Sequence, residues 1–334
     1  MSEAMPAPQR RRLLTLAPAA ALATLATLAI PGAARAADDK PIEWVVGMAA
    51  GGGSDVVART VADAMGRQLG RTIVVSNKPG AATNIAADHV AKSRDPEHML
   101  LTGDFATLAS NPFLYGRLPY NADRDLSSVG LLVRFPLIVV VGPQHPARSF
   151  KELVAWIKAQ PPGVSFGSPG AGTPHHLATE LLLRQLGLKG NHVPYRGAAP
   201  ALQDVAGGQL PFMLVESAGG MALIGSGRVR ALAVSTAQRM KTLPEVPTLQ
   251  EQGVKGFEAF AWQGLSAPAA ASAAHIARLN QALRAAQDST FVKARFQALG
   301  VEVLSSTPEQ MQRFALAERQ RWGALIKELD LRLD

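Results

Sequence analysis

The chain has 334 residues, of which 47% are hydrophobic, and a formal net charge of +8. This length suits two domains and allows a sizeable core. The absence of cysteine excludes disulfides, thiolate metal sites and a cysteine nucleophile. The basic residues form no run interleaved with aromatics, which argues against nucleic acid as a partner.

Residues 1–36 are predicted to be a secretory signal peptide. Arg10-Arg11-Arg12 supplies a positive segment, residues 13–30 carry no charge, and Ala34-Arg35-Ala36 matches an A-x-A cleavage sequence. The paired arginines also resemble a twin-arginine signal, so export by the Sec route or by the twin-arginine route stays open. No later segment is long and apolar enough to cross a membrane. Cleavage near Ala36 therefore predicts a soluble protein in the periplasm.

Beyond residue 36 the hydrophobic pattern alternates between strands and helices. Apolar and β-branched runs predict strands at 42–47, 72–75, 99–102, 131–141, 164–166, 192–195, 210–215 and 230–234. Helices are predicted over 56–69, from 83, from 149, over 175–187, 271–287 and 290–299, and from 307, the last opened by a Thr307-Pro308-Glu309-Gln310 capping signal. Such alternation predicts an α/β fold with mostly parallel sheets covered on both faces.

Two segments repeat the order strand, glycine-rich loop, helix. The first glycine loop is Ala49–Asp55 and the second is Gly167–Thr173. Free amides and the positive end of the helix dipole favour phosphate or carboxylate at such a place. Ser54 or Asp55, and Thr173, are predicted N-caps. Ordinary tight turns of an α/β protein remain the alternative, and neither loop matches a nucleotide-binding fingerprint.

The sequence gives only weak signs of a catalytic site. Residues 163–167 spell the G-x-S-x-G of an α/β-hydrolase, but Ser165 falls inside the predicted strand instead of the turn. An exported hydrolase using Ser165 or Ser168 stays open as an alternative. His175 and His176 are adjacent on a helix and point about 100° apart, so no metal site is predicted. We expect neither an enzyme nor a cofactor.

Eight short sequences occur in an order that identifies a family. They are Gly51-Gly52-Gly53-Ser54-Asp55; Asn77-Lys78-Pro79-Gly80-Ala81; Asn111-Pro112 with Leu114-Tyr115; Gly167-Ser168 to Gly172-Thr173-Pro174-His175-His176; His192-Val193-Pro194-Tyr195-Arg196-Gly197; Leu232-Ala233-Val234; Leu243-Pro244-Glu245-Val246-Pro247-Thr248; and Trp262 with Gly264. From about Ile42 to its C-terminus the chain resembles the substrate-binding receptors of tripartite tricarboxylate transporters, the Bug receptors.

The resemblance implies a two-domain periplasmic-binding-protein fold of type II with a ligand cleft between the domains. It implies chain crossings near Val139–Gly142 and Trp262–Ala267. The first domain would then comprise residues 37–139 and 264–334, and the second residues 140–263. In the family the two glycine loops pinch a carboxylate, partly through ordered water.

Carried over to this chain, the resemblance implies a set of ligand-binding residues drawn from four loops. They are Gly51, Gly52, Gly53, Ser54, Asp55, Asp104, Phe105, Ala106, Thr107, Ser168, Gly170, Ala171, Gly172, Thr173, His176, Glu216 and Ser217. Three departures from the family pattern bear on ligand choice. Met48-Ala49-Ala50 replaces the usual prolines, Leu108 replaces a histidine, and Glu216 replaces an aspartate.

The implied function is that of an exported, monomeric solute receptor. Its ligand is expected to be a small carboxylate, either a di- or tricarboxylate, an aromatic acid or an acidic amino acid. The expected partners are membrane transporter subunits, with a sensor kinase of a two-component system as the alternative.

Overall fold

The computed structural model describes residues 40–333. The predicted signal peptide and its cleavage site near Ala36 lie outside the described residues. These described residues belong to one compact unit. None of the helices in the described range has the combined length and apolar character needed to cross a membrane.

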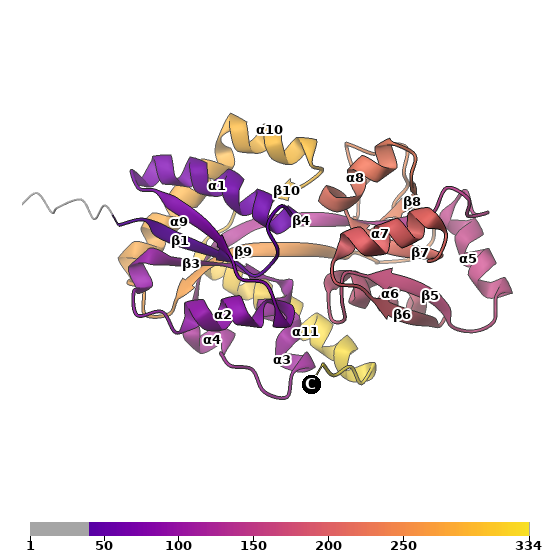
Figure 1. Ribbon diagram of the computed structural model, residues 1–334, viewed down its shortest axis with the longest axis horizontal. Helices are drawn as coiled ribbons and strands as arrows, with labels where there is room; N and C mark the ends of the chain where they lie inside the picture. Colours follow the sequence, from indigo (N-terminus) through magenta and orange to yellow (C-terminus); the bar gives the residue numbers. More distant parts are fainter. Residues whose placement is uncertain (1–39, 334) are drawn as a thin grey trace, which may run out of the picture. The chain divides into compact units, whose positions relative to one another are not determined.

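The strands and helices follow one another mostly in alternation (Figure 1). The strands are β1 (Ile42–Val46), β2 (Ile73–Asn77), β3 (Met99–Asp104), β4 (Leu126–Val141), β5 (Val164–Ser168), β6 (Gly190–Pro194), β7 (Phe212–Glu216), β8 (Arg230–Val234), β9 (Phe260–Pro268) and β10 (Glu302–Val303). The helices are α1 (Gly53–Leu69), α2 (Asn84–Ala91), α3 (Asn111–Leu114), α4 (Ala122–Asp125), α5 (Phe150–Ala159), α6 (Pro174–Gln185), α7 (Ala198–Gly207), α8 (Ser217–Gly225), α9 (Ala273–Asp288), α10 (Thr290–Ala298) and α11 (Pro308–Glu328).

Strand β4 belongs to both halves of the sheet, whose order is β2-β1-β3-β9-β4-β7-β5-β6. Its 16 residues change partners once. From Leu126 to Pro136 it pairs with β9, and from Leu137 to Val141 it pairs with β7, with β8 also paired to this end. Figure 1 shows β4 running from the β1–β3–β9 half into the β5–β8 half. β4 therefore makes backbone hydrogen bonds in both halves of the sheet.

Helices cover both faces of each half, as the alternation predicts. In the first half, α1 packs with α9 on one side, and α2 and α11 lie on the other (Figure 1). In the second half, α5 and α6 share a core with Phe166 and Phe212, whereas α7 covers the opposite face around Ile138 and Met213. These faces bury the apolar residues that set the strand pattern.

The predicted α/β class is confirmed, but the expectation of mostly parallel pairing is wrong around the middle of the sheet. β1 runs parallel to β2 and β3, and β5 runs parallel to β6 and β7. β4 and β9, in contrast, make only antiparallel pairs. β9 was not predicted as a strand, because all nine of its residues are buried and its sequence FAWQGLSAP shows no polar alternation.

The predicted start of the last helix is confirmed. The Thr307 hydroxyl accepts a hydrogen bond from the Gln310 amide at 3.2 Å, and the Gln310 side chain accepts one from the Thr307 amide at 2.8 Å. This reciprocal pair satisfies two backbone donors at the N-terminus of α11.

The end of β4 gives a test of the packing. A Cβ at Gly142 would collide with the backbone oxygen of Val205 in α7, whereas a Cβ at Gly225 meets nothing within 4 Å. We expect Gly142→Ala to lower the free energy of unfolding by about 1–3 kcal/mol, because the backbone of α7 must move. Gly225→Ala, the matched control, should be nearly neutral. Urea denaturation measures both, and equal stabilities would contradict this packing.

Candidate functional site

The first glycine loop leaves the N-terminus of the 17-residue helix α1 open. The N-cap residue is Gly52, which has no side chain to accept a hydrogen bond. Among residues 40–333, no acceptor is present for the backbone amides of Gly53, Ser54 and Asp55. Three free N–H donors therefore lie at the positive end of a long helix, which is the arrangement that binds anions.

The prediction that Ser54 or Asp55 caps α1 is wrong, because both side chains have other partners. The Asp55 carboxylate accepts from the Gly51 amide at 2.9 Å, from Arg59 Nε at 3.0 Å and from Asn77 Nδ2 at 2.9 Å. Burial alone would raise the pKa of Asp55, but the hydrogen bonds from Arg59, Gly51 and Asn77 outweigh it and hold the pKa below its ordinary value. Asp55 therefore holds the first glycine loop in place through its bond to the Gly51 amide.

Asp104, at the end of β3, is a buried acid beside this loop. Its Oδ1 accepts from the Thr107 amide at 2.8 Å and from the Thr83 hydroxyl at 3.3 Å. Burial raises the pKa of Asp104, and these hydrogen bonds only partly offset the rise. Because Asp104 is paired with Gln263 across β3 and β9, its side chain lies on the same face of the sheet as that of Gln263.

The turn that holds Thr83 against Asp104 has an unusual backbone. Ala81, Ala82 and Thr83 all have φ between 45° and 72°, in the left-handed region that non-glycine residues avoid. Asn111 Nδ2 donates to the Ala82 oxygen at 2.7 Å, and a 2.7 Å bond between the Thr83 and Thr107 hydroxyls completes the support. Such strain persists only where neighbouring groups enforce it, and it concentrates at functional sites.

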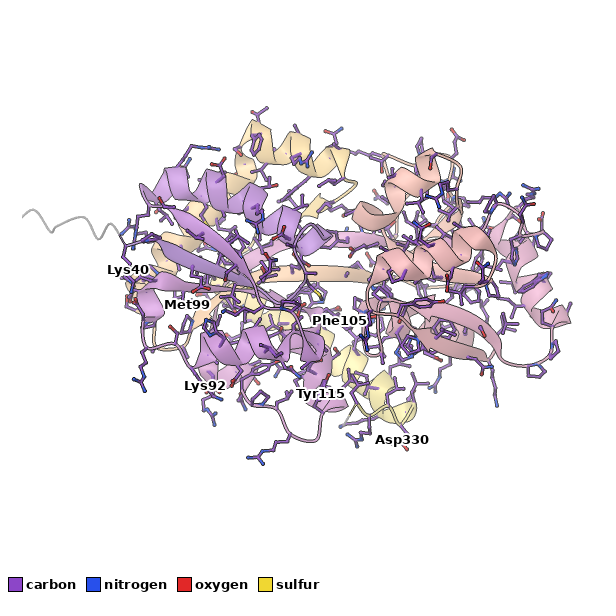
Figure 2. The ribbon with its side chains drawn as sticks, viewed as in Figure 1. Lys40, Lys92, Met99, Phe105, Tyr115 and Asp330 are labelled. Atoms are coloured by element: carbon purple, nitrogen blue, oxygen red, sulfur yellow. The ribbon has the colours of Figure 1, made fainter. Side chains whose placement is uncertain are left out.

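Phe105 and Thr107, which follow Asp104, face the interior. The Phe105 ring packs edge-on against Trp262 and Trp322, with centroids 6.5 and 5.5 Å away. Figure 2 shows the ends of this segment, with Met99 at the start of β3 and Phe105 directly after its end. Thr107 is fully buried, and Ala106 is 8% exposed. The structure thus gives Phe105 a core role.

Glu216, from the second half of the sheet, lies next to the first glycine loop. It ends β7 and is the N-cap residue of α8, and a Cβ at Gly53 would lie 3.2 Å from its Oε1 and 3.6 Å from the Ala218 Cβ. Within residues 40–333, no hydrogen bond or ion pair reaches the Glu216 carboxyl. Burial raises the pKa of this group to about 7. The next residue, Ser217, donates its hydroxyl to the Gly300 oxygen at 2.7 Å.

The second glycine loop is largely satisfied from within. Ser168 Oγ donates to the Gly170 oxygen at 2.8 Å, and Thr173 Oγ1 donates to the same oxygen at 2.7 Å. His176 Nδ1 accepts from the Gly172 amide at 3.1 Å. The predicted Thr173 cap is confirmed, since its hydroxyl accepts from the His176 amide at 3.4 Å. Of the predicted residues here, Gly170, Ala171 and Thr173 are partly exposed, whereas Ser168, Gly172 and His176 are buried.

The two loops contact different elements. A Cβ at Gly172 would collide with Leu114 and come within 3.4 Å of Leu333, so the second loop packs on α3 and the C-terminal segment. The first loop instead approaches Glu216 and Ala218. In the part of the chain that the structure describes, no hydrogen bond joins one glycine loop to the other.

Gln263, in the middle of β9, is a site residue that the sequence reasoning missed. Its Nε2 donates to Ser54 Oγ, its Oε1 is buried without a partner, and the residue is only 5% exposed. The available signal was a single amide side chain between Trp262 and Gly264, in a segment already singled out as a family marker.

The Ser168 hydroxyl lies 2.6 Å from His192 Nε2, which invites comparison with a hydrolase. Ser168 is fully buried, however, and its hydroxyl already bonds within the loop. Burial, together with neighbouring His176, lowers the pKa of His192 to about 3, and no described carboxylate bonds to its ring. Ser165 lies within β5. The pair lacks the orienting acid of a catalytic triad.

The Glu216 carboxyl gives a testable pH dependence. In the unfolded chain it ionises near its ordinary pKa of 4.5, and in the folded protein near 7. The folded state therefore holds the proton longer, and the free energy of unfolding should fall as pH rises from about 4.5 to 7. We expect Glu216→Gln to gain stability over wild type by on the order of 1–3 kcal/mol between pH 5 and pH 8.

Chemical denaturation of wild type and variant at both pH values measures this gain. Exposed Glu245 supplies the matched control, Glu245→Gln, for which no such pH-dependent difference is expected. Parallel stability curves for wild type and Glu216→Gln would contradict the burial of this acid.

Comparison with known proteins identifies the family. Residues 57–331 match the model of the tripartite tricarboxylate transporter family receptor. The chain is 34% identical over 309 residues to the protein BugT of Bordetella pertussis, covering 92% of this chain and 95% of that one. The solved structure of the periplasmic binding protein BugD is 33% identical with a TM-score of 0.78, covering 88% of this chain and 99% of that one.

A second solved structure, Rpa4515 of R. palustris with adipate, is 30% identical with a TM-score of 0.82 and covers 88% of this chain and 98% of that one. These neighbours confirm the predicted periplasmic-binding-protein fold and give the hydrolase alternative no support. The matched family model describes receptors, and BugD is a periplasmic binding protein, not an enzyme. The chain therefore belongs to the tripartite tricarboxylate transporter receptors and is a solute-binding receptor.

Proposed function

We propose that this receptor captures a small carboxylate at the open N-terminus of α1. The main support is the set of free amides of Gly53, Ser54 and Asp55. They supply hydrogen-bond donors and positive potential, and no side-chain cap competes for them. The similar protein Rpa4515 was solved with adipate, a dicarboxylate, which supports this ligand class. A ligand carboxylate would supply the acceptor that these three donors lack.

In this proposal the chain comprises two domains, residues 37–139 with 264–334 and residues 140–263, that close over the ligand. Support comes from β4, which changes partners between Pro136 and Leu137 and is the strand shared by both halves. Asp104 and Glu216 would line the site beside the first glycine loop, and Thr107 would hold Asp104 in place through its amide. The backbone of the second glycine loop would contact the ligand from the other domain, partly through hydrogen bonds to ordered water.

The proposed partners are the membrane subunits of a tripartite tricarboxylate transporter, with the receptor acting as a monomer in the periplasm. Export would depend on the predicted signal peptide, by the Sec or the twin-arginine route. A receptor that serves a sensor kinase is the second candidate. Neighbouring genes separate the two, since uptake requires membrane transporter subunits and sensing requires a histidine kinase.

Ligand binding is tested by thermal unfolding with a panel of di- and tricarboxylates, aromatic acids and acidic amino acids. At a concentration 100 times its Kd, a ligand that binds only the folded state adds about 2.7 kcal/mol of stability, so the midpoint should rise by several degrees. No shift from any member of the panel would count against a carboxylate ligand.

The position of the site is tested with Gly53→Val. A Cβ here would lie 3.2 Å from Glu216 Oε1, the end of a flexible side chain that must shift slightly, and 3.5–3.6 Å from Phe135 and Ala218. The larger valine side chain would point toward Glu216 and cover the free amides. We expect carboxylate affinity to fall at least about tenfold while the free protein still unfolds cooperatively, which shows that the variant is folded. Gly225→Ala is the control, and a Gly53→Val variant that binds as wild type does would exclude this loop.

A further inference from the structure

Gln263 is placed where an apolar residue would serve the fold better. β9 is buried along its whole length, and Gln263 is the fourth of its nine residues. Asp104 of β3 lies opposite on one side and Val133 of β4 opposite on the other. Burying a primary amide is unfavourable unless each end finds a hydrogen-bond partner.

Only one end of this amide has a partner. Nε2 donates to Ser54 Oγ, and Oε1 has none in residues 40–333. A serine hydroxyl both donates and accepts, so rotating the amide by 180° would merely exchange the bonded and the free end. In either orientation Gln263 keeps one unused hydrogen-bonding group beside the first glycine loop.

A second buried glutamine shows what a structural role looks like. Gln287 is 1% exposed, and its Nε2 donates to the backbone oxygens of Leu131 and Leu132 of β4 at 2.9 and 3.0 Å and to that of Leu304 at 3.1 Å. It ties α9 to the sheet. The Oε1 atom of Gln287, like that of Gln263, has no partner among the described residues. The difference lies in the bonded end, because Gln263 makes no bond to backbone and reaches only a side chain of the candidate site.

The neighbourhood of the free end suggests what would satisfy it. Both hydrogen bonds to Asp104 end on Oδ1, which leaves Oδ2 without a donor among the described residues. A ligand whose carboxylate takes the amides of Gly53 and Ser54 would bring its adjoining carbon toward Gln263 and Asp104. A methylene there offers nothing to either group, whereas a hydroxyl or an ammonium can donate to the carboxylate oxygen and pair with the amide.

We propose that Gln263 contacts the ligand and, with Asp104, makes the receptor selective for carboxylates that carry a hydroxyl or amino group beside the bound carboxylate. The inference rests on the proposed function, and it adds which members of the carboxylate class are preferred. Leaving buried polar groups unpaired is the strongest way a site rejects a ligand that lacks one substituent.

Isothermal titration calorimetry with matched ligands tests the proposal. The series are succinate, malate and aspartate; glutarate, 2-hydroxyglutarate and glutamate; and adipate with 2-aminoadipate. In the series that binds, the wild-type protein is expected to bind a substituted member at least about tenfold more tightly than the unsubstituted one. Whether the hydroxyl or the amino compound binds best identifies the donor.

Two variants assign the preference to Gln263. Gln263→Met keeps the volume without the amide, and Gln263→Asn keeps the amide but shortens its reach. Both are expected to lose most of the preference for the substituted ligand, so that the ratio of the two affinities approaches one. Gln287→Met, the matched control, should lower the unfolding midpoint and keep the preference.

The outcomes separate this inference from the proposed function. Wild-type protein that binds an unsubstituted diacid as tightly as its substituted partners would overturn the inference and leave the carboxylate receptor intact. So would Gln263→Met and Gln263→Asn proteins with the wild-type preference. Absence of binding by every carboxylate would contradict the proposed function, and the inference would fall with it.

Discussion

The structure depends on β4, a single strand that must satisfy two sets of neighbours. Its first part is held between β9 and β10, and its last residues between β7 and β8. Because the backbone ladder is continuous, the end of β7 is held near the loops that follow β1 and β3. Glu216 reaches the first glycine loop for this reason, and a site assembled from segments about 160 residues apart needs no further scaffold.

The two glycine loops look equivalent in sequence and differ in physical character. Both connect a strand to a helix, and both contain glycines with positive φ, at Gly51 in the first and at Gly170 and Gly172 in the second. The second loop uses most of its donors internally, through Ser168, Thr173 and His176. The first directs the Asp55 side chain back to the Gly51 amide and leaves the helix end free. Anion-binding capacity is therefore concentrated at α1.

Much of the fold could be predicted from the sequence, and the residues that were missed show why the rest could not. The predicted helices have helical periodicity, the predicted strands are apolar or β-branched runs, and the Thr307–Gln310 cap has a fixed spacing. These elements were predicted correctly, whereas α7 was missed. β9 has no periodicity because it is buried on both faces. The partners of Ser54 and Asp55 depend on Gln263 and Asn77, which are distant in sequence. The order of family markers indicated a receptor, whereas the roles of Phe105 and Gln263 required the packing around β9.

A crystal structure with a bound carboxylate tests the central claim most directly. We expect a ligand carboxylate oxygen about 2.7–3.2 Å from the amide nitrogens of Gly53, Ser54 or Asp55, with Glu216 and Gln263 within reach of the same ligand. A ligand held elsewhere, without a hydrogen bond to any of those three amides, would contradict it.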